Sequence, residues 1–180
     1  MEISGPPSLA LRVDYSFRMP SFPAAFLLTW TCYGTWLHGD ARGAVDCRHR
    51  TPGEPFLPPD APRRASEQAK LRHPPVRLRS AARQVVVETL ARHTQHRRWT
   101  LHALAVRTNH MHVVVSCDVH PDRARDQFKA WSTRRLREAG LCPREVDVWT
   151  EGGSDRWLWN DTEIRDAARY VVEQQGATLD

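Results

Sequence analysis

Hydrophobic and polar residues alternate in several short stretches of this chain, which is the pattern of half-buried strands. The clearest is Trp99 to Val106, and the apolar run from Met111 to Val115 also predicts a strand because it is rich in β-branched residues. Thr108 and Asn109 form a short polar link between them, so the two strands are predicted to make a β-hairpin. Further strands are predicted over residues 26–33, 146–149 and 156–159, the last two around a Gly-containing turn.

Three longer stretches carry apolar residues at helical spacing, and each is predicted to be an amphipathic helix. They run from Ser80 to His96, from about Asp118 to Gly140, and from Asn160 to about Gly176. The third begins with an Asn-x-x-Glu sequence that resembles a capping box and ends at a glycine. The core-facing positions are Ala82, Val85, Val86, Thr89 and Leu90 in the first, Phe128, Trp131 and Leu136 in the second, and Ile164, Ala167, Ala168, Val171 and Val172 in the third.

The order strand, helix, hairpin, helix, strand, helix predicts an α+β fold, with an antiparallel sheet and helices packed on one face. A chain of 180 residues is expected to form one domain. We expect a flexible N-terminal segment over residues 1–22, a domain over 23–180, and a Pro- and Arg-rich insert at about 38–79. The insert either clamps a DNA strand with its arginines or is a floppy connection, and the sequence favours neither.

Composition adds a basic charge without deciding its partner. The formal charge is +5, and arginine supplies almost all of the positive charge because Lys70 and Lys129 are the only lysines. A guanidinium suits phosphate contacts, which indicates a nucleic-acid partner as readily as an ordinary solvated surface. No apolar run is long enough to span a membrane, and the four cysteines are scattered, so we expect a soluble cytoplasmic protein with reduced thiols.

The most specific candidate chemistry is the pair His110 and His112, which are separated by one residue on a predicted strand. Side chains two residues apart on a strand point to the same face, so the two imidazoles can share one divalent ion. Two ordinary polar residues on a half-exposed strand would give the same pattern. Tyr170 and Gln174 lie one turn apart on the last predicted helix and offer a phenol nucleophile beside a neutral oxygen ligand. A boundary tyrosine with a wet hydroxyl is the alternative.

Taken together, these motifs resemble the single-tyrosine branch of the His-hydrophobic-His (HUH) nucleases, in particular the REP-associated tyrosine transposases. The resemblance covers about residues 25–175. It rests on the Asn109-His110-Met111-His112 strand, on Tyr170 at the place of the catalytic tyrosine, and on Gln174 at the place of the third metal ligand. Residues 29–36 resemble the first strand of the family, and Arg156 to Trp159 resembles the segment that leads into the tyrosine helix. Many relatives have Asn-Pro after that helix, where this chain has Gln174-Gln175-Gly176.

The resemblance implies a ferredoxin-like or RRM-like sheet with His-x-His on a central strand and the nucleophile on the C-terminal helix. It implies Mg²⁺ or Mn²⁺ as the metal, single-stranded or hairpin DNA as the substrate, and strand transfer through a 5′-phosphotyrosine. The protein would be a monomer or a homodimer, and nucleoid-associated when bound to DNA. Candidate DNA-binding residues are Arg123, Arg125, Lys129, Arg134, Arg135 and Arg156.

Three other interpretations remain open from the sequence. The first is a domesticated protein that binds hairpin DNA without transposition activity. The second is an RNA-binding domain of RRM-like shape, although no RNP-type aromatic strand is found. The third is a metal-dependent hydrolase of small phosphoesters, for which Tyr170 would be dispensable.

Overall fold

The computed structural model describes residues 22–41 and 57–173; residues 1–21, 42–56 and 174–180 are outside the described part. Within the described part, the chain forms a mixed α and β structure. The elements are β1 (Ala25–Thr31), α1 (Ala61–Ala69), α2 (Ser80–Arg97), β2 (Thr100–Val106), β3 (His110–Ser116), α3 (Pro121–Glu138), β4 (Ser154–Leu158) and α4 (Asp161–Glu173).

The described strands form one antiparallel sheet in the order β2-β3-β1-β4. β3 and β1 are the inner strands, and the predicted β2-β3 hairpin is present. In β1 and β3, residues directly opposite each other include Thr29 with His112 and Thr31 with His110. The fold is therefore α+β with an antiparallel sheet, as the order of elements predicted.

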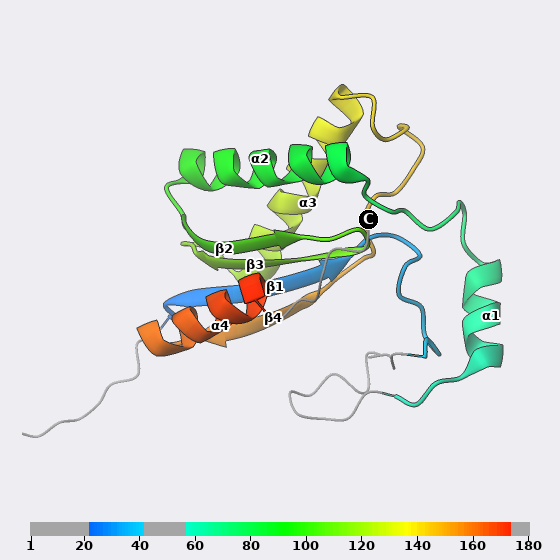
Figure 1. Cartoon of the computed structure of the whole chain (residues 1–180), viewed down its shortest axis with the longest axis horizontal. Helices are drawn as coiled ribbons and strands as arrows, with labels where there is room; N and C mark the ends of the chain where they lie inside the picture. The colour runs from blue at the N-terminus through cyan, green and yellow to red at the C-terminus, as the bar shows by residue number, and fades with distance from the viewer. Residues whose placement is uncertain (1–21, 42–56, 174–180) are drawn as a thin grey trace, which may run out of the picture.

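Helices cover both faces of the sheet, so the expectation that they pack on one face is wrong. Figure 1 shows α2 and α3 on one side and α4 on the other. The larger core lies between the sheet and α2 and α3, and includes Phe26, Trp30, Val86 and Phe128. The smaller core lies between the sheet and α4. Every residue from Met111 to Val115 is buried, as expected for a strand covered on both faces. In a strand covered on one face alone, buried and exposed residues would alternate.

The predicted strand at 146–149 is reduced to a single bridge between Trp149 and Cys32. Side chains of α3 bind carbonyl groups in and around this segment. Arg137 donates to the carbonyl oxygens of Arg144 and Val146, and Lys129 donates to that of Thr150. These bonds satisfy the backbone without a partner strand.

Trp131 is 42% exposed, so its predicted place in the core is also wrong. Its ring lies against His93, and the guanidinium of Arg134 lies 5.2 Å from the ring centroid. A neighbouring cation and a partner ring let an indole remain at the surface of a helix.

The insert is described over residues 38–41 and 57–79, and the second of these segments contains helix α1, which the sequence pattern did not predict. The side chain of Asp60 caps this helix by accepting a hydrogen bond from the backbone N–H of Arg63, and Pro62 lies in its first turn. Both are ordinary signals of a helix start. Within the described residues, no helix combines the length and the apolar character needed to cross a membrane.

Candidate active site

Strand β3 places His110 and His112 on the same face of the sheet, the face that α4 partly covers. Their ring centroids are 5.0 Å apart, and the rings are nearly perpendicular. Met111 and Val113 point to the opposite face and pack in the larger core. The hydrophobic residue between the histidines therefore fixes which face they occupy.

His112 is 7% exposed, and Thr29 on β1 holds it in place. Thr29 Oγ1 lies 2.7 Å from His112 Nδ1. Thr29 is directly opposite His112 in the register of β1 and β3, so the two side chains are cross-strand neighbours on the same face. When Nδ1 donates this bond, the lone pair of the imidazole is on Nε2, the nitrogen that can then bind a metal ion.

His110 is held in a similar way by the residue before it. Its Nδ1 lies 2.8 Å from Asn109 Oδ1. The backbone carbonyl of Asn109 accepts hydrogen bonds from Cys32 N at 2.8 Å and from Thr35 Oγ1 at 3.1 Å. The segment that follows β1 thus holds the turn that carries Asn109, and the Asn109 side chain contacts the ring of His110.

Helix α4 brings Tyr170 to the same face. Asn160 Oδ1 accepts the backbone N–H of Glu163, and the carboxylate of Glu163 accepts the N–H of Trp159, so the start of the helix is capped from both sides. Ile164, Ala167 and Val171 bury the helix against the sheet. α4 lies along this face of the sheet and contacts β2 and β3 (Figure 1).

The ring centroid of Tyr170 is 6.1 Å from that of His112, with the rings nearly perpendicular. The tyrosine is 42% exposed, so its edge is open to a ligand while its inner side contacts the imidazole. A phenol and two imidazoles from two elements therefore meet at one place on the sheet. Gln174, the predicted third metal ligand, lies outside the described residues.

The donor set formed by the histidines fits a divalent metal ion. Each imidazole has an oxygen partner at Nδ1, and two neutral nitrogen donors would not reduce the charge of a bound ion. Among the described residues, no group of three or more His, Cys, Asp or Glu side chains is arranged to hold a metal.

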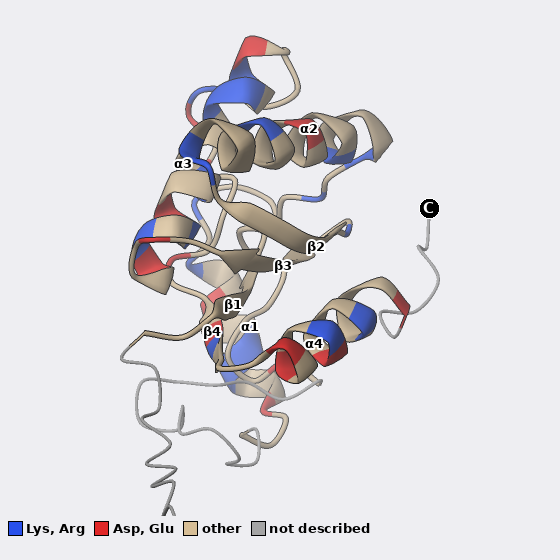
Figure 2. Ribbon diagram, turned by 90° about the vertical axis from the view of Figure 1, so that its left-hand side faces the viewer, with Lys and Arg blue, Asp and Glu red and all other residues tan. Residues whose placement is uncertain are grey.

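The predicted DNA-binding residues do not form one patch. Arg123 and Arg156 are exposed, whereas Arg134 and Arg135 both pair with Glu138. Figure 2 shows blue and red segments interleaved on α3 rather than a surface of one sign.

Arg125 points inward, so its predicted place on an outward DNA-binding face is wrong. Its side chain is 6% exposed and pairs with Asp122 and, at 3.7 Å, with Asp155 on β4. Gly153 makes room for it, because a Cβ there would come within 2.7 Å of Arg125 Cδ. A buried guanidinium needs such carboxylate partners, which makes Arg125 a link between α3 and β4.

Lys129 is half-buried and turned toward the loop after Trp149. Its Nζ donates to the carbonyl oxygens of Thr150 and Gly152. Burial, followed by the charge of Arg125, lowers the pKa of Lys129 to about 8. These contacts direct the Lys129 amine toward the protein backbone and away from an outward DNA-binding position.

Arg156 is the candidate DNA-binding residue on the His face. In the sheet register it lies opposite Leu27 of β1, which in turn lies opposite Val114 of β3, and Val114 packs under α4. α4 packs against β2 and β3, while Ser154 and Arg156 on β4 are exposed. This face therefore has a covered half that carries Tyr170 and a more open half that carries a cation.

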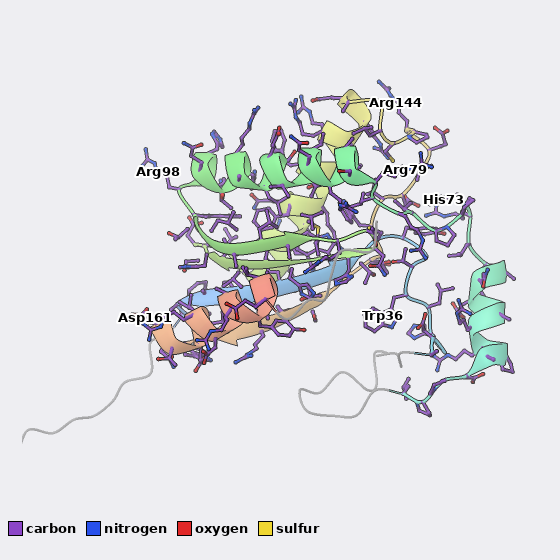
Figure 3. The ribbon with its side chains drawn as sticks, viewed as in Figure 1. Trp36, His73, Arg79, Arg98, Arg144 and Asp161 are labelled. Carbon is purple, nitrogen blue, oxygen red and sulfur yellow. The ribbon has the colours of Figure 1, made fainter. Side chains whose placement is uncertain are left out.

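The insert approaches the site beside Asn109. A polar cavity of about 210 Å³ is lined by Asn109, by Thr35 and by residues of the insert that include Arg64 and Arg77. Figure 3 shows Trp36 projecting from the segment between β1 and the insert. Arg64 and Arg77 of the insert thus line the same cavity as Asn109, the residue that contacts His110.

Comparison with models of protein families and with curated proteins gives no match. Among solved structures, the chain is similar to a structure of a REP-associated tyrosine transposase bound to a REP hairpin, with a TM-score of 0.48 and 12% sequence identity. The alignment covers 83% of this chain and 65% of that chain. The function proposed below rests instead on the side chains of the candidate site.

Proposed function

We propose that this chain is a metal-dependent enzyme that cuts and transfers single-stranded DNA near hairpins, with Tyr170 as the nucleophile. The observation that carries the proposal is the position of the Tyr170 ring beside His112, on the face of the sheet where His110 and His112 lie together. The sequence motifs that resemble the HUH nucleases coincide with these three residues.

His110 and His112 would hold Mg²⁺ or Mn²⁺, with Gln174 as a proposed third ligand. When bound, the ion would supply positive charge to a non-bridging phosphate oxygen. Arg156 is proposed to bind a neighbouring phosphate on the open half of the face.

Tyr170 attacks phosphorus through Oη, and the phenol proton passes to solvent water as the Oη–P bond forms, since the side chain is 42% exposed. The P–O3′ bond breaks, the 3′ oxygen takes up a proton, and the 5′ end remains on the tyrosine as a phosphodiester. One ester bond is exchanged for another, so a free 3′-hydroxyl can reverse the step on a different strand. This chemistry yields strand transfer rather than hydrolysis.

The test is incubation of the protein with hairpin-bearing single-stranded DNA from the flanks of its own gene, with Mn²⁺, followed by a denaturing gel. We expect a covalent protein-DNA adduct that is lost in Tyr170→Phe, in His110→Ala and on chelation of the metal. Tyr33→Phe is the matched control, because it removes a phenol hydroxyl that binds the backbone N–H of Arg72 outside the site. Tight binding without an adduct would instead identify a hairpin-binding protein, and an adduct that persists in Tyr170→Phe would exclude this nucleophile.

A further inference from the structure

Trp157 on β4 is an exposed indole that the protein holds in a fixed orientation. It is 39% exposed, although tryptophan is a highly buried residue on average. Its ring meets Phe26 edge-on at 5.9 Å and His120 edge-on at 6.2 Å. A second indole, Trp159, lies beside it with a centroid distance of 5.8 Å.

A polar chain from the interior fixes the polar edge of this ring. Trp157 Nε1 donates to Asp155 Oδ2 at 2.9 Å, and Asp155 Oδ1 lies 3.7 Å from Nη1 of the buried Arg125. Because Nε1 is already used within the protein, the indole does not need an outside hydrogen-bond acceptor. What remains exposed is apolar ring surface in a set position, which suits stacking.

Trp131 shows the contrast on the same side of the sheet. It is exposed to a similar degree, but the Arg134 guanidinium already lies over its ring. Trp99 and Trp149 bind Asp118 and the carbonyl of Lys129 and are more buried. Among the described tryptophans, Trp157 combines an internally bound Nε1 with a large exposed ring surface.

The place of Trp157 relative to the candidate active site fits a continuous strand of nucleic acid. It lies opposite Phe26, three positions along β1 from Thr29, and β4 is two strand spacings from β3. This corresponds to about 10 Å along the strands and about 10 Å across them. Arg156, the preceding residue, points to the face of Tyr170, so the two sides of the edge strand β4 present a cation and an indole.

We propose that Trp157, with Trp159 beside it, is a stacking platform for an unpaired base of single-stranded DNA that passes around β4 from the Tyr170 site. The proposal rests on the proposed function for the identity of the nucleic acid. Recognition by stacking tolerates any base, because every base presents a π face. Arg125 acts in this arrangement as a positioning residue, through Asp155.

The test is the affinity for a fluorescent single-stranded oligodeoxynucleotide, measured by anisotropy in a Tyr170→Phe background without added metal. Trp157→Ala is expected to weaken binding roughly 5- to 100-fold, and Trp157→Phe is expected to retain most of it. Trp131→Ala, the matched control, is expected to bind like the parent. Equal affinities for Trp157→Ala and its parent would overturn the proposal. Tighter binding to an RNA oligonucleotide than to the DNA oligonucleotide of the same sequence, lost in Trp157→Ala, would also overturn it.

A second measurement keeps the test valid when a variant fails to fold. The wild-type chain is irradiated with an oligodeoxynucleotide that contains 5-iodouracil, and the crosslink is mapped by mass spectrometry. A crosslink at Trp157 or Trp159 supports the platform, and crosslinks confined to other residues overturn it. A stacking defect in Trp157→Ala without any Tyr170 adduct in the wild type would reject the proposed function alone, and an adduct with unchanged binding would reject the platform alone.

Discussion

The two histidines of β3 are oriented by oxygen atoms from different sources. The partner of His112 is a hydroxyl on the neighbouring strand, whereas the partner of His110 is the amide side chain of the residue before it. An imidazole whose Nδ1 is fixed presents Nε2 in one direction, which lowers the cost of arranging the ligands around an ion. The quality of the proposed metal site therefore depends on Thr29 and Asn109 as well as on the histidines.

Replacing Thr29 with valine removes the hydroxyl and keeps the shape of the side chain. We expect Thr29→Val to weaken Mn²⁺ binding roughly 10- to 100-fold, because the ring of His112 loses the partner that sets its tautomer and angle. Titration of Mn²⁺ into the protein, followed by calorimetry, measures this directly.

Thr29→Ser is the matched control, since it restores the hydroxyl without the methyl group, and it is expected to recover most of the affinity. Melting temperatures of the three proteins separate a folding defect from a ligand defect. Equal Mn²⁺ affinities for the valine and threonine proteins would show that the 2.7 Å contact does not position a metal ligand.

At the scale of elements, α4 connects the proposed nucleophile, Tyr170, to the sheet through a small apolar core. This core contains alanines at positions 25, 103 and 167, so few large side chains hold the helix. Val171, which follows Tyr170, is fully buried in it. The position of Tyr170 should thus respond to packing changes in this core more than to equal changes in the larger one.

Val171→Ala and Val86→Ala test this point as a matched pair. Both valines are on helices and fully buried, but Val86 lies in the core on the opposite face. Each substitution removes two buried carbon atoms and should cost about 1.5–3 kcal/mol of unfolding free energy in urea titrations.

Adduct formation should fall in Val171→Ala and remain near the wild-type level in Val86→Ala, at a temperature where both are folded. Equal losses of adduct in the two variants would mean that stability alone, and not the seating of α4, controls the yield.

Periodicity in the sequence located α2, α3, α4 and the β2-β3 hairpin, because each has enough apolar residues to reveal its period. It missed α1, where no residue is buried and the signal was the Asp60 cap with Pro62. The prediction of a strand at 146–149 was wrong because Lys129 and Arg137 bind the surrounding carbonyl groups. These contacts come from a distant helix, so the local sequence pattern does not reveal them.

The same limit applies to the candidate site. His-x-His and Tyr170 were visible as motifs, but the orienting role of Thr29 required the register of β1 against β3. The inward position of Arg125 required the close approach of Gly153 and the carboxylates of Asp122 and Asp155. Charge and helical spacing alone predict that this arginine points to solvent.

At the scale of the whole molecule, some of the basic side chains hold elements together and others are exposed. Arg125 and Lys129, two of the six predicted DNA-binding residues, connect α3 to β4 and to the loop before it. Arg123 and Arg156 remain exposed. Fewer of the predicted DNA-binding cations are therefore exposed than charge and helical spacing predict.

Lys129 also makes the stability of the molecule depend on pH in the alkaline range. The ordinary pKa of its amine is 10.5, and burial lowers the pKa in the folded protein to about 8. Between these two values the unfolded chain binds more protons than the folded chain, so the free energy of unfolding rises with pH. Below about pH 8 both states carry the proton, and this contribution to the slope disappears.

Lys129→Met removes the titrating group and keeps an apolar stem. We expect the wild type to gain stability relative to Lys129→Met between about pH 8 and 10.5, with a slope of at most about 1.4 kcal/mol per pH unit, reduced by the partial exposure of the amine. Urea unfolding of both proteins at a series of pH values measures the difference and cancels the titration of other groups. A stability difference between wild type and Lys129→Met that stays constant from pH 8 to 10.5 would show that the ammonium keeps its charge in the folded state, and that its bonds to Thr150 and Gly152 fully replace water.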